Sequence, residues 1–166
     1  MKKMILMGLS LFMVLSCASP PRFTPITKPN QPDLESKIDK ERMGRVIKSY
    51  LGVPYQKNGS SLFGIDCSGL VVEIYRRYGG LDLPHDVDKL YKIAKKIKRN
   101  ELVYGDLVFF ALDYAKHLDD NQVSHVGIYI DEGKFVHSSE TKGVIISSLE
   151  DSYYDRRYVG ARRVVP

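Results

Sequence analysis

Apolar residues at helical spacing mark two segments in the first half of the chain. The first segment has one apolar face, made by Met43, Val46, Ile47, Tyr50 and Leu51. Because residues three and four apart share a helix face, this spacing predicts a helix that begins near residue 38 and ends before Gly52 and Pro54.

The second segment has the same period and clearer boundaries. Its apolar positions are Cys67, Leu70, Val71, Ile74, Tyr75 and Tyr78. Asp66 stands at the position of an N-cap, and Gly79 and Gly80 are typical of a helix end. We therefore expect Cys67 in the first turn of this helix, and a shorter third helix after Asp86.

From Gly105 onward the pattern changes to short apolar runs separated by turn residues. These runs predict strands at residues 107–112, 123–130, 134–138, 143–147 and 157–165. Helices followed by strands indicate an α+β fold with an antiparallel sheet. The length of 166 residues fits a single folded domain, which we expect at residues 38–166.

The first 16 residues have the layout of a secretory signal. Two lysines precede an uncharged apolar run at residues 4–15, which is too short to span a bilayer as a helix. The run ends in Val-Leu-Ser-Cys at residues 14–17, which resembles the bacterial lipobox. We expect residues 1–16 to be removed and Cys17 to be acylated. A plain signal peptide, with Cys17 near the cut by chance, is the alternative.

Residues 17–37 separate this signal from the predicted domain. They hold five of the eight prolines and few apolar residues, which predicts an extended spacer. Two acyl chains on Cys17 give a stable membrane attachment that one chain does not. The sequence therefore predicts an exported protein anchored by lipid to a bacterial membrane, facing the periplasm from the outer membrane where the cell has one.

The formal net charge is +5, yet the predicted domain itself is close to neutral. Without residues 1–16 the chain has 23 basic and 20 acidic side chains. The densest basic run, from Lys92 to Arg99, fits a solvated helix face, and we interpret the pair Arg162-Arg163 in the same way. Because nucleic-acid binding requires a concentrated basic face, we expect no nucleic-acid partner.

Cys67 is the single thiol left once Cys17 is acylated. A lone cysteine is often a small, inert core residue. In the first turn of a helix, however, a thiol faces unpaired backbone N–H groups and the positive end of the helix dipole. These lower the thiol pKa and can also stabilise a developing oxyanion. We expect Cys67 to be a nucleophile with a lowered pKa.

Two histidines fall on one face of the predicted sheet. Residues 131–133, Asp-Glu-Gly, predict a three-residue hairpin loop in which a type I turn is closed by Gly133 in the left-handed region. This register places position 125 opposite position 139. His125 and His137 then lie one diagonal step apart, where the two imidazoles can reach each other.

We assign no role to a zinc site or to the other two histidines. Cysteine and histidine also bind zinc, but the paired spacing of zinc ligands is missing, so we expect no metal and no cofactor. His85 and His117 lie in loop-like segments without a partner pattern, and we expect both to be exposed to solvent.

Five short motifs occur in a fixed order along the predicted domain. They are Gly52-Val53-Pro54-Tyr55, Asp66-Cys67-Ser68-Gly69-Leu70-Val71, Gly105-Asp106-Leu107-Val108-Phe109-Phe110, His125-Val126-Gly127-Ile128-Tyr129 and Phe135-Val136-His137. Together they resemble the NlpC-type family of cell-wall peptidases over residues 41–163. The resemblance implies a papain-like fold, with N-terminal helices packed on an antiparallel sheet of five to six strands and the nucleophile at a helix N-terminus.

The resemblance also implies a Cys-His-His catalytic triad. Cys67 is the nucleophile, His125 is first the general base and then the acid, and His137 orients His125. Such a triad forms and hydrolyses an acyl-enzyme.

Three further residues match positions with a role in the family. Tyr55, with the backbone N–H of Cys67, is the candidate oxyanion partner. Asp66 and Ser68 match positions that help to bind the free amine of the peptidoglycan stem peptide, although the N-cap interpretation competes for Asp66.

The family typically cuts the bond between D-glutamate and the diamino acid of the stem peptide, and we expect the same bond here. Residues 57–59, 84–87 and 111–124 depart from the family pattern and could line the cleft. A catalytically silent wall-binding lipoprotein and an acyltransferase or transamidase on the same fold are the alternatives.

Overall fold

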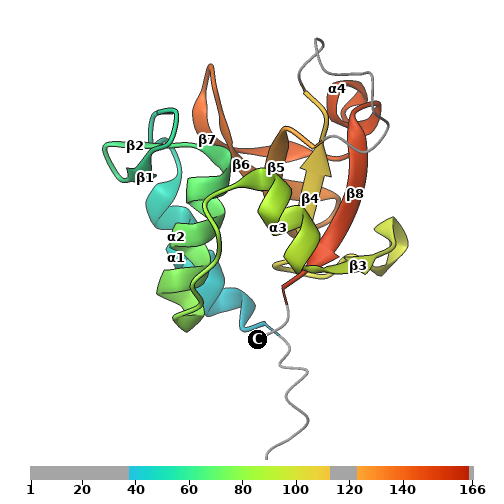
Figure 1. Cartoon of the computed structure of the whole chain (residues 1–166), viewed down its shortest axis with the longest axis horizontal. Coiled ribbons are helices and arrows are strands. Elements are labelled where there is room, and N and C mark those ends of the chain that lie inside the picture. Colours follow the sequence, from blue (N-terminus) through green and yellow to red (C-terminus); the bar gives the residue numbers. More distant parts are fainter. Residues whose placement is uncertain (1–37, 113–122, 165–166) are drawn as a thin grey trace, which may run out of the picture. The chain divides into compact units, whose positions relative to one another are not determined.

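The computed structural model describes residues 38–112 and 123–164 (Figure 1). The signal peptide, the acylated Cys17, the spacer and His117 lie outside these residues and stay predictions. Within the described ranges, no helix has the length and apolar character needed to cross a membrane.

Three helices occupy the positions that the hydrophobic period predicts. They are α1 (Lys40–Tyr50), α2 (Cys67–Gly79) and α3 (Val87–Ile93). The residue before each helix is an aspartate whose carboxylate accepts a backbone N–H of the first turn, so the N-terminal amides are satisfied. After α2, Gly80 has a φ of 69°, a left-handed conformation that glycine adopts without strain. A short helix, α4 (Ser152–Asp155), was not predicted.

Six antiparallel strands form the main sheet, in the order β3-β8-β4-β5-β6-β7. These strands are β3 (Lys95–Ile97), β4 (Leu107–Phe110), β5 (His125–Asp131), β6 (Lys134–Ser139), β7 (Gly143–Ser148) and β8 (Tyr158–Arg163). The short strands β1 (Ser60–Ser61) and β2 (Gly64–Ile65) form a separate pair just before α2. The predicted α+β fold, with helices on an antiparallel sheet of five to six strands, is confirmed.

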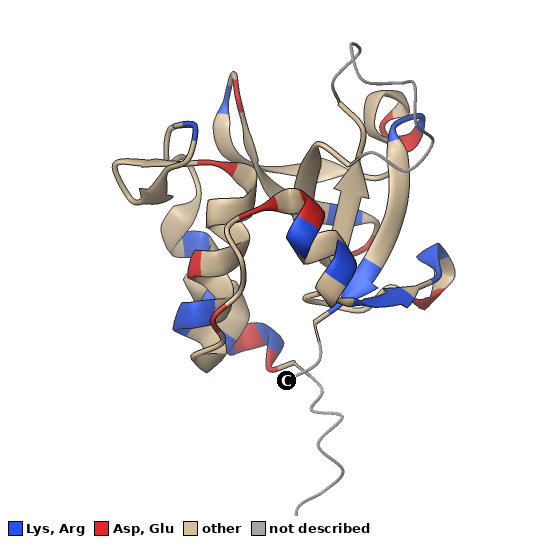
Figure 2. Ribbon diagram, viewed as in Figure 1, with Lys and Arg blue, Asp and Glu red and all other residues tan. Residues whose placement is uncertain are grey.

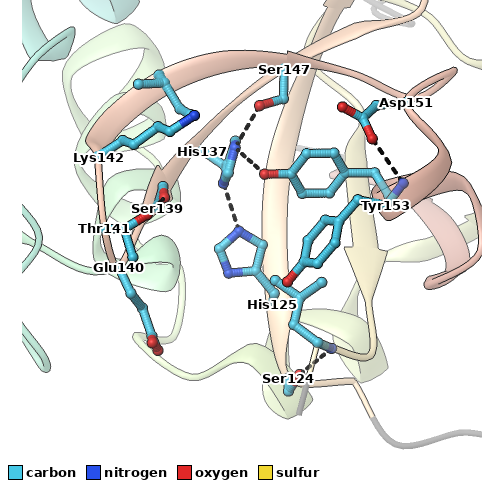
Figure 3. A pocket seen from close by; sticks show the side chains of 13 residues that line it. Ser124, His125, His137, Ser139, Glu140, Thr141, Lys142, Ser147, Asp151 and Tyr153 are labelled. Carbon is cyan, nitrogen blue, oxygen red and sulfur yellow. Dashed lines mark hydrogen bonds between the residues drawn. The ribbon is translucent and has the colours of Figure 1, made fainter. Parts of the chain in front are cut away.

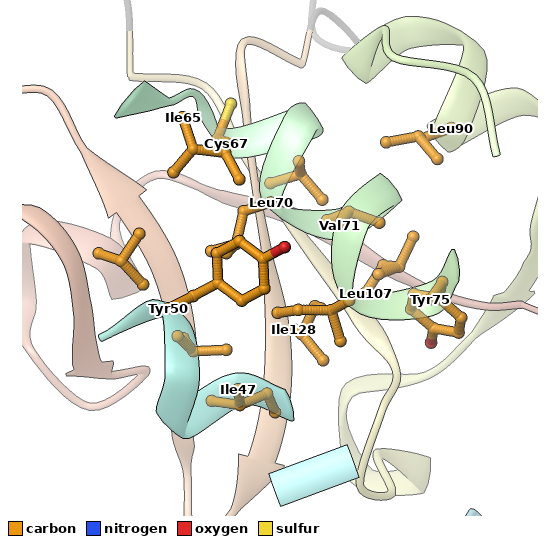
Figure 4. Close-up of a cluster of buried hydrophobic side chains, with 14 of the residues drawn as sticks. Ile47, Tyr50, Ile65, Cys67, Leu70, Val71, Tyr75, Leu90, Leu107 and Ile128 are labelled. Atoms are coloured by element: carbon orange, nitrogen blue, oxygen red, sulfur yellow. The ribbon is translucent and has the colours of Figure 1, made fainter. Parts of the chain in front are cut away.

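Helices α1 and α2 cover one face of the sheet through aliphatic side chains (Figure 4). Ile47 of α1, Leu70 and Val71 of α2, Leu107 of β4 and Ile128 of β5 are all at most 4% exposed. Burying apolar area at about 25 cal/mol per Å² makes this cluster the main stabilising contact between the helices and the sheet.

The opposite face of the sheet carries an aromatic cluster. Phe110 and Phe135 lie 4.9 Å apart between ring centroids, and Tyr154 and Tyr158 pack against Phe110. Because successive side chains of a strand point to opposite faces, β6 contributes Phe135 to this cluster and Val136 to the aliphatic one.

The hairpin between β5 and β6 has the predicted register but not the predicted turn. Tyr129 pairs with Phe135, which places position 125 opposite position 139 as expected. The turn, however, is closed by Asp131 and Lys134, with an irregularity before Asp131. Glu132 and Gly133 both have positive φ, 50° and 69°, so the loop is a two-residue turn of the I′ kind rather than a type I turn. The extra residue in β5 compensates for the shorter loop, and the register is therefore unchanged.

The basic run from Lys92 to Arg99 is exposed, but it is not a helix face. Helix α3 ends at Ile93, and residues 95–97 form the edge strand β3 beside β8 (Figure 2). Charged side chains are typical of an edge strand because they oppose pairing with another chain. The interpretation of Arg162-Arg163 as solvated is also wrong. Arg162 is 8% exposed, and Arg163 binds the buried carboxylate of Asp106 at 2.8 Å.

Candidate active site

Cys67 is the first residue of α2, as the sequence predicts, and its thiol is buried. The side chain is 9% exposed and lies at the edge of the aliphatic cluster (Figure 4). The backbone of Val126, the neighbour of His125 in β5, interacts with the thiol. The start of α2 therefore meets the start of β5.

Burial, not the helix terminus, decides the pKa of the thiol. Backbone groups of Val126, Ser68 and Cys67 itself favour the thiolate, but the loss of hydration and the nearby carboxylate of Asp66 disfavour it. Burial is the largest effect and raises the pKa of Cys67 to about 11. The expectation of a lowered pKa is therefore wrong, and the resting thiol is neutral.

The loop before α2 is held against the helix start by close backbone contacts. Tyr55 forms a parallel bridge with Ile65, two residues before Cys67, and the amide of Asp66 donates to the Gly59 carbonyl at 3.1 Å. A Cβ at Gly69 would collide with the carbonyl oxygen of Gly59. Glycine at this position lets the loop that carries Tyr55 approach the first turn of α2.

Asp66 is the N-cap of α2 and the centre of a buried hydrogen-bond cluster. Its Oδ1 accepts the amide of Gly69 at 2.7 Å and the hydroxyl of Ser68 at 3.1 Å. The amide of Asn58 donates to Oδ2 at 2.9 Å. The N-cap interpretation of Asp66 is thus correct, and its carboxylate already has several partners from its own chain.

His85 is a further partner of Asp66. Its Nε2 lies 2.8 Å from Oδ1, and its side chain is 32% exposed. The expectation that His85 reaches solvent holds, but the expectation that it lacks a partner does not. The signal that sequence reasoning missed is its position beside the N-cap of α3, which brings the loop of residues 84–87 next to the start of α2.

His125 and His137 contact each other directly, as the same-face placement predicts. Nε2 of His125 lies 2.8 Å from Nδ1 of His137, and the rings are nearly perpendicular (Figure 3). The side chains are 6% and 1% exposed. Burial lowers the pKa of both rings, to about 3 for His125 and to about 4 for His137, and the neighbouring His137 adds to the effect on His125. Both imidazoles are therefore neutral near pH 7.

The hydrogen bonding continues beyond His137 to two residues that the sequence did not single out. Nε2 of His137 lies 3.0 Å from Oγ of Ser147 and 3.2 Å from the hydroxyl of Tyr154. Ser147 belongs to β7 and is paired with Phe135, whereas Tyr154 belongs to α4. The period-2 alternation of β7 could have placed Ser147 on the histidine face, but no sequence pattern predicts α4.

A cavity of about 490 Å³ opens beside the two imidazoles (Figure 3). Its wall includes Ser139, Glu140 and Lys142 from the β6–β7 hairpin, and Asp151 and Tyr153 from the start of α4. Polar and charged groups of both signs thus surround a space that is in contact with His125 and His137. Across residues 38–112 and 123–164, no three His, Cys, Asp or Glu side chains gather in a way that could hold a metal ion.

The family model for the NlpC/P60 family matches residues 52–163, which include every motif quoted above. This chain belongs to the NlpC/P60 family. The match covers α2 with Cys67, β5 with His125 and β6 with His137.

Two curated relatives have comparable identity. The Escherichia coli K12 protein named murein DD-endopeptidase MepS/murein LD-carboxypeptidase is 40% identical over 126 residues, which are 76% of this chain and 63% of the relative. The Bacillus cereus protein named gamma-D-glutamyl-L-lysine dipeptidyl-peptidase is 38% identical, over 72% of this chain and 34% of the relative. The chain therefore spans less than two thirds of the length of either relative.

Among solved structures, an NlpC/P60 family protein from Bacillus cereus has the same fold. Its TM-score is 0.68 at 35% identity, covering 76% of this chain and 40% of that one.

Proposed function

We propose that this chain is a cysteine peptidase that hydrolyses peptide bonds in the stem peptides of peptidoglycan. The proposal is supported by membership of the NlpC/P60 family and by relatives that are named as peptidases of murein or of glutamyl-lysine peptides. The observation that carries it is the 2.8 Å contact between His125 of β5 and His137 of β6, at the start of β5, where the backbone of Val126 interacts with the buried thiol of Cys67.

In this mechanism, Sγ of Cys67 attacks the carbonyl carbon of the scissile bond while Nδ1 of His125 takes the thiol proton. His125 then gives that proton to the leaving amine, and the C–N bond breaks to leave a thioester. His125 next removes a proton from water, which attacks the thioester and releases the acid and the thiol.

The neutral resting state of Cys67 and His125 determines when the proton moves in the first step. Burial raises the pKa of the thiol to about 11 and lowers that of His125, so both charged forms are disfavoured before substrate arrives. Proton transfer to His125 therefore accompanies attack by sulfur rather than preceding it. The backbone N–H of Cys67 and the hydroxyl of Tyr55 are our candidates for stabilising the oxyanion.

The cavity beside the histidines is suited to the leaving half of the substrate. Because His125 must protonate the amine that leaves, that amine and the residue attached to it lie on the histidine side of the thiol. A diamino acid carries both an amine and a carboxylate, and Lys142 and Glu140 at the rim of the cavity offer both signs of charge. The acyl half then extends toward Tyr55, Asp66 and Ser68.

Three bonds are consistent with the relatives' names. We retain the bond between D-glutamate and the diamino acid, which the family resemblance implies and which agrees with the gamma-D-glutamyl-L-lysine peptidase. The name of the Escherichia coli relative supports a DD bond and an LD bond as the other two. The experiment below distinguishes the three, because each bond gives products of different mass.

We also propose that the protein is exported and held to a membrane by acylated Cys17. The apolar run at residues 4–15, the lipobox-like residues 14–17 and the proline-rich spacer support this location. Metabolic labelling with a fatty acid tests it, because label that is lost in a Cys17→Ala chain supports acylation, whereas label that persists contradicts it.

The activity is tested by incubating purified peptidoglycan fragments with the full-length chain under reducing conditions and identifying the products by mass spectrometry. The fragments include linear and cross-linked stem peptides. We expect cleavage by the wild type and none by Cys67→Ala, whose thermal unfolding is measured in parallel to show that it folds.

Each other outcome identifies an alternative. Cleavage of the cross-link alone would assign the DD bond. Products that form only when an amine or alcohol is added would indicate an acyltransferase. Retention of the chain on peptidoglycan with no product, in a folded protein with a free thiol, would indicate a wall-binding lipoprotein.

A further inference from the structure

The hydrogen bonds of His137 extend to a pair of hydroxyl groups that the triad itself does not need. Nε2 of His137 lies 3.0 Å from Oγ of Ser147 and 3.2 Å from the hydroxyl of Tyr154. Ser147 and Tyr154 thus present two hydroxyl oxygens to the same ring nitrogen. His137 is thus held from both ring nitrogens, by His125 on one side and by this pair on the other.

The chemistry of His125 determines which nitrogen of His137 carries a proton. To accept the thiol proton at Nδ1, neutral His125 must carry its own proton at Nε2. That Nε2–H donates to Nδ1 of His137, which must therefore have a free lone pair. Neutral His137 then has its proton at Nε2, and this N–H requires an acceptor, because an unsatisfied buried donor costs about 1–3 kcal/mol.

Ser147 and Tyr154 supply that acceptor in a fixed place. Oγ of Ser147 is the nearer oxygen, and β7 holds it beside β6 through the pairing of Ser147 with Phe135. The ring of Tyr154 packs against Phe110, Phe135 and His137 at centroid distances of 5.5, 5.0 and 5.3 Å. Burial raises the pKa of Tyr154, so its hydroxyl stays protonated and neutral.

We propose that Ser147 and Tyr154 are positioning residues that hold His137 in the tautomer with the proton at Nε2. Through His137 they direct the lone pair at Nδ1 of His125 toward the thiol of Cys67. This role rests on the proposed function for its effect on rate, but the tautomer itself is a property of the free protein.

The first test reads the tautomer without substrate. The full-length chain is labelled with ¹⁵N-histidine, and the ring nitrogens of His125 and His137 are observed by NMR near pH 7. We expect both rings to be protonated at Nε2 in the wild type. In the double variant Ser147→Ala/Tyr154→Phe, His137 should lose that preference, with a second tautomer appearing. An unchanged tautomer in the double variant would overturn the proposal.

The second test reads the rate. At metal sites, removing the groups that orient a liganding histidine typically costs about 10- to 100-fold in metal affinity or activity, and we take the same range for the oriented His137. We expect a loss of this size in kcat for the double variant, because both hydroxyls act through His137. Ser147 and Tyr154 also line the cavity proposed for the leaving half of the substrate, so KM is measured in parallel to separate weaker binding from lost positioning. Each single variant should lose less, since the other hydroxyl remains as an acceptor. A kcat equal to that of the wild type alongside a changed tautomer would overturn the catalytic part of the proposal.

Three variants separate positioning from general damage to the fold. Ser147→Thr keeps a hydroxyl at the same place and should restore the tautomer and most of kcat. Tyr158→Phe is the matched control, because the hydroxyl of Tyr158 is buried without a hydrogen-bond partner among the described residues, although its ring also packs on Phe110. The Tyr158→Phe variant should change neither the tautomer of His137 nor kcat. If the double variant does not fold, the single variants Ser147→Ala and Tyr154→Phe carry both tests.

A wild type that is inactive on peptidoglycan but shows His137 protonated at Nε2 would contradict the proposed function and leave the positioning role intact. A wild type that is active with His137 protonated at Nδ1 would contradict the positioning role and leave the proposed function intact. The two proposals can therefore fail separately.

Discussion

Strands β5 and β6 have one face of aliphatic side chains and one face that carries two buried histidines. Toward α1 and α2 they present Val126, Ile128 and Val136, whose fully buried side chains belong to the aliphatic cluster. On the other face, the same strands present His125 and His137, also buried but connected through polar atoms. The aliphatic face gains stability from burial, whereas on the histidine face burial works against the charged form of each ring.

This contrast shows how a strand can serve stability and chemistry at once. Each catalytic candidate has an aliphatic neighbour, as His125 has Val126 and His137 has Val136. The neighbour is locked into the main cluster, so the backbone that carries the histidine is fixed without any contribution from the histidine itself. Substitutions on the two faces should therefore have separable effects.

The largest effect is expected from His125→Asn, which breaks the chemistry and leaves the packing. Loss of the proposed general base and acid should lower the rate of peptide cleavage by about 10³-fold, or about 4 kcal/mol in the barrier. The free energy of unfolding should change by only about 1 kcal/mol, the value of a typical hydrogen bond. Turnover and urea unfolding measured on the same preparation check this. A rate loss explained entirely by unfolded protein would show that the two faces are not separable.

The next effect is expected from Ile128→Ala, the converse change on the aliphatic face. Ile128 is 0% exposed, and truncating a buried isoleucine costs about 2–5 kcal/mol of stability. The rate per folded molecule should match that of the wild type, because the histidine face is untouched. Urea unfolding gives the stability, and turnover at a temperature where the variant is fully folded gives the rate. A fall in that rate would mean that the aliphatic cluster does more than fix the backbone.

A graded effect is expected from acidification, because the two buried rings of the histidine face respond to each pH unit in turn. Burial lowers the pKa of His125 and His137 from 6.5 to about 3 and about 4. The unfolded chain therefore binds more protons below pH 6.5 than the folded chain does. The stabilising contribution is complete above pH 6.5 and is lost as the pH falls, by up to about 1.4 kcal/mol per pH unit for each ring.

Urea unfolding between pH 7.5 and pH 5 measures this dependence. The double variant His125→Asn/His137→Asn should have a clearly flatter profile than the wild type over that range. Identical slopes would show that the two rings are already protonated in the folded protein.

Local patterns were sufficient to predict the elements that position the site. The period of α2, its Asp66 cap and Gly80 end, and the alternation along β5 and β6 each depend on residues close in sequence. The contact between His125 and His137 follows from that alternation together with the register, which was correct even though the turn at residues 131–133 was not.

Features that depend on distant contacts were missed. Strand β3 is short and charged, and it becomes a strand only by pairing with the distant β8. Lys95 lies opposite Arg163 and Lys96 opposite Arg162, a register that the sequence does not reveal. The raised pKa of Cys67 reflects burial by the folded domain, which outweighs the local helix terminus. Ser147 and Tyr154 reach His137 only through the packing of β7 and α4.

The neutrality of the His125-His137-Ser147-Tyr154 chain has a consequence for the medium in which the protein works. Dissolved salt weakens attractions between separated charges, and it acts most strongly on exposed ion pairs such as Lys40 with Asp131 and Arg99 with Asp155. A relay of uncharged groups offers dissolved ions no charge to screen. We therefore expect the alignment of these four side chains to be independent of ionic strength, which would suit the exported location proposed above.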